Sequence, residues 1–178
     1  GGILEKREYR DCQCVAALLP PGGGYNSVDP RFLSLFNTIT MLFPKEKSIE
    51  TIYDSILSHH FKKFKFAKEF DDLCKDITKA TYKVYQRIIV ALPRSPIKFH
   101  YVFNLRDLSK MYQGLLRSRP TVFTSRESFI RLWKNECLRV FVDKLVTNDD
   151  KKTVEVDILN SVMKETFGDD IMKKMNEG

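Results

Sequence analysis

The chain has 178 residues, 43% of them hydrophobic, which is enough for one sizeable core or for two small subdomains that share a boundary. Its 30 basic and 23 acidic residues leave a net charge of +7, which suits acidic partners such as nucleotides or nucleic acid. No apolar run approaches the roughly 20 residues of a membrane-spanning helix and the four cysteines lack zinc-site spacing, so we expect a reduced cytoplasmic protein with no metal of its own.

The first predicted element is a short buried strand. Residues 12–19 are mostly apolar, with polar residues before them and the loop PPGGGYN at 20–26 after them. Cys12 and Cys14 fall at alternating positions of this strand. We expect both to be buried as small side chains and not to bind metal.

A short helix and a second strand are predicted next. Asp29 before Pro30 has the pattern of an N-cap followed by proline in the first helical position, which predicts a helical turn over 31–36. The second predicted strand covers 38–43. Because a complete sheet needs more strands than these two, we expect residues 1–44 to be one edge of an α/β subdomain.

Two helices are predicted after this edge, because apolar residues recur at helical spacing. The second helix should end near Leu92, since Pro93 and Pro96 cannot donate backbone hydrogen bonds. His59 and His60 lie near the end of the first helix, where we expect them only to meet the last carbonyl groups. The repeating apolar residues are Ile49, Ile52, Tyr53, Ile56 and Leu57, then Phe70, Leu73, Ile77, Tyr85 and Ile88.

A third helix should begin at Asn104. Asn104 and Asp107 have the pattern of an N-cap with an acidic residue in the first turn. The helix that follows would bury Leu108, Met111 and Leu115.

Two more helices complete the predicted pattern. Thr124 with Glu127 predicts a capping box for the first of them. The last helix should cover 154–167 and end at Gly168. Residues 45–178 are therefore predicted to form a mostly helical subdomain. The residues expected to face inward are Phe129, Leu132, Trp133, Cys137, Val140 and Phe141, then Val154, Ile158, Val162 and Phe167.

The sequence predicts no self-contained active site. The glycine loop at 20–26 lets backbone amides approach an anion, but it lacks the lysine and hydroxyl residue of the GxxxxGK[ST] phosphate loop. From the residues alone, an ordinary flexible turn is the favoured interpretation of this loop. No Ser–His–acid arrangement, HExxH motif or pair of catalytic carboxylates is present in the sequence.

Two arginines lie at predicted helix starts. Arg106 is in the first turn after Asn104, where the positive end of the helix dipole disfavours a cation unless an anion lies close. Either Asp107 or a ligand phosphate fits that role, and the sequence leaves both open. Arg31 occupies a similar position, for which a surface ion pair with Asp29 is an alternative explanation.

The densest basic run contains Lys62, Lys63, Lys65 and Lys68. A solvated helix face explains such a run, and a basic helical module that binds nucleic acid is the alternative. The aromatic residues recur at helical spacing, which assigns them to the core and not to base stacking.

Four segments resemble dynein heavy chains and occur in the family's order. They are CVAALLPPGGGYN at 14–26, DPRFLSLFN at 29–37, KFHYVFNLRDLS at 98–109 and RLWKNECLRVF at 131–141. The resemblance is to the third AAA+ module of the motor ring in an axonemal, inner-arm-like heavy chain. It implies a mainly α fold, in which the C-terminal part of the AAA+ α/β subdomain over 1–44 precedes a helical lid subdomain over 45–178.

The resemblance also implies roles for three residues. Arg106 occupies the position of the lid's second sensor arginine, which reaches the γ-phosphate of the nucleotide in its own module. Arg31 falls in the segment that offers an arginine finger to the neighbouring module, although the family often has a second arginine where this chain has Ser34. Asn26 follows the first sensor strand, whose polar side chain orients the attacking water in AAA+ enzymes.

By the same resemblance, the parent protein is an ATP-hydrolysing microtubule motor of the ciliary or flagellar axoneme. Its implied cofactors are ATP or ADP with Mg²⁺. Its implied partners are neighbouring AAA+ modules, microtubules and other dynein subunits, with no nucleic acid and no membrane. We expect this segment to sense nucleotide and transmit conformational change around the ring, and not to hydrolyse ATP by itself. A scaffold without a nucleotide role is the remaining alternative.

Overall fold

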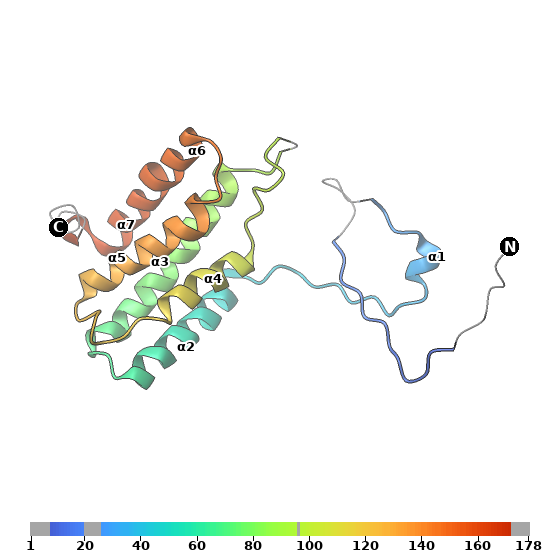
Figure 1. Ribbon diagram of the computed structural model, residues 1–178, viewed down its shortest axis with the longest axis horizontal. Coiled ribbons are helices and arrows are strands. Elements are labelled where there is room, and N and C mark those ends of the chain that lie inside the picture. The colour runs from blue at the N-terminus through green and yellow to red at the C-terminus, as the bar shows by residue number, and fades with distance from the viewer. Residues whose placement is uncertain (1–7, 20–25, 96, 172–178) are drawn as a thin grey trace. The chain divides into compact units, whose positions relative to one another are not determined.

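The computed structural model describes residues 8–19, 26–95 and 97–171. The chain divides into two units, Gly1–Phe43 and Pro44–Gly178 (Figure 1). Most of the predicted glycine loop, residues 20–25, lies outside the described residues.

The first unit contains the short helix α1, Pro30–Leu33. The Arg31 backbone N–H donates to Asp29 Oδ1 at 2.8 Å, and Pro30 occupies the first turn, where its missing N–H is not needed. The predicted cap is therefore confirmed. The helix is shorter than the predicted 31–36, although the turn continues to Phe36, whose N–H bonds to the Leu33 carbonyl at 3.1 Å.

The two predicted strands are absent from the described part of the first unit. Residues 12–19 and 38–43 make no backbone hydrogen bonds to each other, and Cys12 and Cys14 are exposed, so the prediction that these cysteines are buried was also wrong. The physical reason is that a strand is stabilised by pairing with a neighbouring strand and by burial of one face. Among the residues described, these two segments have neither.

The second unit is helical. Its helices are α2 (Glu46–Phe64), α3 (Glu69–Ala91), α4 (Leu105–Leu115) and α5 (Arg126–Cys137), which continues as the π-helical segment η1 (Leu138–Val142). A last helical run follows as α6 (Asn148–Lys152), the π-helical segment η2 (Thr153–Leu159) and α7 (Asn160–Phe167). Figure 1 shows these helices side by side as a bundle, and α3 is central because it packs against α2, α5, η2 and α7.

The core of this unit contains most of the predicted apolar positions. Its largest fully buried side chains include the predicted Trp133, Phe70 and Phe129, and also Tyr112 and Phe61, which the periodicity did not single out. The helix predicted from the repeating apolar residues is present, but two of those residues lie outside the core, since Ile52 is 51% exposed and Ile56 is 42% exposed. Among the residues described, α2 packs mainly against α3 and α4, and Ile52 and Ile56 lie outside these contacts, exposed to solvent.

Several predicted helix ends are confirmed and one is corrected. Helix α3 ends with Leu92 as its C-cap, immediately before Pro93. The predicted capping box of α5 is displaced by one residue, because the N-cap is Ser125, with an extended backbone of φ −122° and ψ 157°, and not Thr124. Ser125 and Ser128 exchange hydrogen bonds, with the Ser128 N–H donating to Ser125 Oγ at 3.2 Å and the Ser125 N–H donating to Ser128 Oγ at 3.3 Å.

The last helical run begins earlier than predicted. Thr147 caps α6, its Oγ1 accepting a hydrogen bond from the Asp150 N–H at 3.3 Å. Residues 148–153 contain no apolar side chain, so periodicity gave no signal for this first turn. The predicted end is confirmed, since Gly168 has φ 87° and its N–H bonds to the Lys164 carbonyl at 3.1 Å.

Candidate functional site

The first turn of α4 holds the candidate site. The Arg106 backbone N–H donates to Asn104 Oδ1 at 2.9 Å, and the Asn104 backbone N–H donates to Asp107 Oδ2 at 3.1 Å. The predicted cap is therefore present as a complete capping box. It places the Arg106 side chain at the amino-terminal end of the helix, exposed to solvent.

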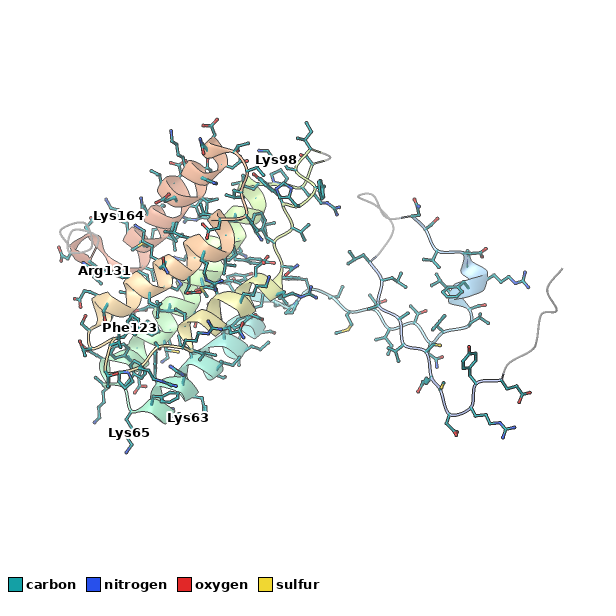
Figure 2. All side chains as sticks on the ribbon, viewed as in Figure 1. Lys63, Lys65, Lys98, Phe123, Arg131 and Lys164 are labelled. Atoms are coloured by element: carbon teal, nitrogen blue, oxygen red, sulfur yellow. The ribbon has the colours of Figure 1, made fainter. Side chains whose placement is uncertain are left out.

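The segment before α4 is anchored to the start of α6. The buried Tyr101 hydroxyl donates to Asp150 Oδ2 at 2.8 Å and accepts a hydrogen bond from the Val146 N–H at 3.1 Å. Lys98, labelled in Figure 2, lies with its Nζ 2.5 Å from the same carboxylate oxygen. The hydrogen bond from Lys98 is the largest cause that lowers the pKa of Asp150, to about 2. This carboxylate therefore holds the entry to α4 in place near neutral pH.

A second anchor comes from α2. The Tyr53 hydroxyl donates to the Leu105 carbonyl at 3.1 Å and lies 2.9 Å from the Ser109 hydroxyl. The Tyr53 ring stacks on Tyr112, with ring centroids 4.4 Å apart and planes 11° apart. Since Tyr53 of α2 contacts the first turn of α4 and also Tyr112 further along that helix, the backbone that carries Arg106 has a defined position within this unit.

Asp107 is engaged by residues other than Arg106. Lys144 Nζ lies 3.0 Å from Asp107 Oδ2, and it also donates to the Val102 carbonyl at 3.2 Å. The Asp107 side chain is 13% exposed, so this ion pair is largely shielded from water. Within the described ranges, Arg106 makes no ion pair with Asp107 or with another acid.

The other two predicted site residues lie in the first unit. Arg31 is exposed, and Asp29 accepts a hydrogen bond from its backbone N–H. No ion pair between the Arg31 guanidinium and Asp29 is present, in contrast to the surface pair that the sequence allowed. Asn26 is exposed, next to the undescribed loop residues. Arg106 belongs to the second unit, so each of the three residues is positioned only within its own unit.

Two contacts around the bundle were missed by sequence reasoning. Lys144 is 37 residues from its partner Asp107, and nothing local in the sequence marks the pair. His60 is buried and its Nε2 lies 3.1 Å from Ser118 Oγ, so the expectation that it meets only helix carbonyls was wrong. Burial is the main cause that lowers the pKa of His60 below its ordinary value.

Two negative findings apply to the residues described. They contain no group of three or more histidine, cysteine, aspartate or glutamate residues arranged to hold a metal ion. None of their helices combines the length and the apolar character needed to cross a membrane. The candidate site is the exposed Arg106 cation on the capped and anchored first turn of α4. This geometry fits an anionic group.

Comparison with known proteins identifies related sequences over nearly the whole chain. A sequence model of the AAA+ lid domain matches residues 76–177, and a model of the P-loop containing dynein motor region matches residues 3–44. The chain is 44% identical over 167 residues to the dynein-1-alpha heavy chain of the flagellar inner arm I1 complex from Chlamydomonas reinhardtii, which covers 94% of this chain and 4% of that protein.

Two animal proteins are similar over comparable lengths. Dynein axonemal heavy chain 10 from Homo sapiens is 41% identical over 177 residues, or 99% of this chain and 4% of that protein. The ciliary dynein beta chain from Tripneustes gratilla is 34% identical over 161 residues, or 90% of this chain and 4% of that protein. The chain thus spans a small fraction of the length of the relatives it matches.

Proposed function

We propose a function for this chain from the premise that it belongs to the AAA+ lid domain family, in the form carried by dynein heavy chains. In this proposal the helical unit is the lid of the third AAA+ module of a motor ring. It senses the nucleotide of that module through Arg106 and passes a change of conformation to adjacent modules.

The observation that carries the proposal is the ion pair between Lys144 and Asp107. Because Lys144 and the Asn104 N–H occupy the Asp107 carboxylate, the nearest acid in the sequence is not paired with Arg106. An exposed guanidinium at a helix N-terminus then remains able to bind phosphate oxygens, which it can do with two parallel hydrogen bonds. These features support a nucleotide phosphate as the anion that balances Arg106.

Two residues of the first unit have supporting roles in this proposal. Arg31 is the arginine finger that reaches the nucleotide of the neighbouring module, where such a residue accelerates hydrolysis by roughly 10³- to 10⁵-fold. Asn26 contacts the nucleotide of its own module. Exposure of both side chains supports these roles, since each must reach a ligand outside its own unit.

The whole heavy chain is proposed to hydrolyse ATP and to move along microtubules in the axoneme of a cilium or flagellum. The relatives' names, which include flagellar inner arm and ciliary dyneins, support this location. Arg106 and Asn26 would hold ATP or ADP, which binds with Mg²⁺ supplied with the nucleotide. Neighbouring AAA+ modules, microtubules and other dynein subunits are the proposed partners. By itself the chain is proposed to have no ATPase activity.

The test is Arg106→Ala in the parent motor, with Lys110→Ala as the control. Lys110 is an exposed cation one turn further along α4, so its removal changes the net charge equally. We expect Arg106→Ala to weaken binding of a fluorescent nucleotide by about 10- to 100-fold, because the charge-assisted contact to phosphate is lost. We also expect it to change the microtubule gliding velocity. Wild-type binding and gliding in this variant would favour a scaffold without a nucleotide role.

A second measurement addresses the isolated chain. A highly purified sample should show no ATP turnover above the buffer rate. Turnover that disappears with Arg106→Ala would contradict the proposal that the segment only senses nucleotide.

A further inference from the structure

The positive charge of the chain is concentrated in two acid-free stretches. Residues 55–68 and 108–126 together contain eight lysines and arginines and no aspartate or glutamate. Since the whole chain has a net charge of +7, the rest of the chain has a net charge of −1. The basic character noted from composition therefore belongs to these two stretches.

The fold brings the ends of the two stretches together. His60 on α2 lies with its Nε2 3.1 Å from Ser118 Oγ in the connection between α4 and α5. The guanidinium carbon of Arg119 lies 4.1 Å from the centre of the Phe64 ring, and Lys63 Nζ lies 5.7 Å from the same centre. The carboxyl ends of α2 and α4 therefore share one end of the bundle.

Five cations at this end define a surface that we call the basic end. They are Lys62, Lys63, Lys65, Arg117 and Arg119, and all five are exposed. Figure 2 shows Lys63 and Lys65 at the end where α2 and α3 are joined. None of the five makes an ion pair within the described residues, whereas cations elsewhere do, as in Arg87–Glu165, Lys98–Asp150, Arg139–Glu136 and Lys144–Asp107.

Helix dipoles account for only part of this arrangement. The carboxyl ends of α2 and α4 favour nearby cations, which explains Lys62 and Lys63 in the last turn of α2. Five like charges on the carboxyl end of α2 and on the α4–α5 connection repel one another, and a compact protein without a partner gains nothing from that repulsion. Arg119 and Lys63 also lower the pKa of His60, after the larger effect of burial, which indicates a positive potential at this end.

From this charge distribution we propose that the basic end is a docking surface for an acidic polypeptide segment, such as a run of glutamates in a partner protein. The aromatic rings nearby argue against single-stranded nucleic acid as the bound group, because such strands bind by stacking their bases on free rings. Phe66 packs against Phe61 and Phe70, with ring centroids 5.0 and 5.1 Å away, and Arg119 covers Phe64. These rings are engaged, so they do not form a free platform for stacking bases.

The test is binding of a fluorescein-labelled decaglutamate peptide to the 178-residue chain at low salt, followed by anisotropy. The variant Lys62→Glu with Arg117→Glu reverses two exposed charges of the basic end. The control is Lys47→Glu with Lys152→Glu, which changes the net charge equally. Lys47 lies 15 residues before Lys62 on α2, or about 22 Å away along the helix.

We expect the Lys62/Arg117 variant to bind the peptide at least about tenfold more weakly and the control to bind within about twofold of the original chain. Binding should also weaken with added salt, because the screening length falls from ~8 Å at 0.15 M to ~3 Å at 1 M. A second variant, Lys63→Glu with Arg119→Glu, should also weaken peptide binding. Circular dichroism would show whether this variant remains folded.

Three results would overturn the proposal. The first is no detectable peptide binding by the original chain at low salt. The second is equal weakening by the control variant, which would assign binding to net charge alone. The third is tighter binding of a 20-base-pair DNA duplex than of the peptide, which would assign the surface to nucleic acid.

Discussion

Lys144 Nζ lies 3.0 Å from Asp107 Oδ2, and this ion pair joins the segment after η1 to the first turn of α4. Asp107 also closes the capping box by accepting the Asn104 N–H. One carboxylate therefore serves both the local cap and a tertiary contact. The neighbouring Arg106 is left exposed and without an acidic partner among the residues described.

The first prediction concerns this pair. Lys144→Met removes the partner of a largely shielded carboxylate, so we expect the free energy of unfolding to fall by about 1–3 kcal/mol. Asp107 would then be available to Arg106, and nucleotide affinity in the parent module should fall as well. Denaturant unfolding and fluorescent-nucleotide titration are the measurements. Lys144→Arg keeps the charge and should preserve both properties, and equal losses in the two variants would contradict the assigned role.

The second prediction concerns Gly114 on α4. A Cβ atom there would overlap the carboxylate of Glu136, which is 8% exposed and bonded to Arg139 with its Nε 3.0 Å from Oε2. Gly114→Ala should therefore destabilise the bundle by about 1–3 kcal/mol, despite the better helix propensity of alanine. In a Glu136→Ala background the same change should be tolerated. A double-mutant cycle from denaturant unfolding that shows additive effects would exclude this clash.

The third prediction is a stability loss in acid that depends on Asp150. Its pKa is lowered from 3.8 to about 2, first by the hydrogen bond from Lys98. Because the folded state binds the proton less readily than the unfolded state, the stabilisation is complete above about pH 4 and is lost as the pH falls toward 2. Thermal unfolding midpoints between pH 5 and pH 2 should therefore drop less for Asp150→Asn than for the original chain. Identical pH profiles would rule out this linkage.

The fourth prediction concerns His60. Burial lowers its pKa below 6.5, and Arg119 and Lys63 lower it further, while the hydrogen bond with Ser118 raises it. The unfolded chain then binds the proton more readily, so His60 should destabilise the fold as the pH falls below 6.5. Nuclear magnetic resonance titration of the imidazole should give a higher pKa in Arg119→Ala than in the original chain. Lys152→Ala, a change of equal charge on α6, should leave the value unaltered.

Local patterns in the sequence predicted the cap that positions Arg106. Asn104 and Asp107 are three residues apart, and the hydrogen bonds that they make close within one helical turn. Local patterns also predicted the Asp29 cap before Pro30 and the end of the last helix at Gly168. The Ser125 cap was missed by one residue because adjacent threonine and serine offer the same hydroxyl chemistry.

Strand pairing and burial depend on residues far apart in the chain, and the sequence carries no comparable local signal for them. The strands predicted over 12–19 and 38–43 have the right composition, but a strand forms only when other chain segments supply its hydrogen bonds and cover one face. Ile52 and Ile56 follow the helical period yet remain exposed, because the period does not say how much of a helix surface has a partner.

The sequence by itself determined the helical bundle, its family resemblance and the placement of Arg106 in a capped first turn, since these depend on interactions between residues a few positions apart. Only the tertiary structure decided that Lys144 binds Asp107 and that the cations of α2 and of the α4–α5 connection share one end of the bundle. The physical reason is that ion pairs and charged surfaces depend on distance in space, and packing of the core brings together side chains tens of residues apart.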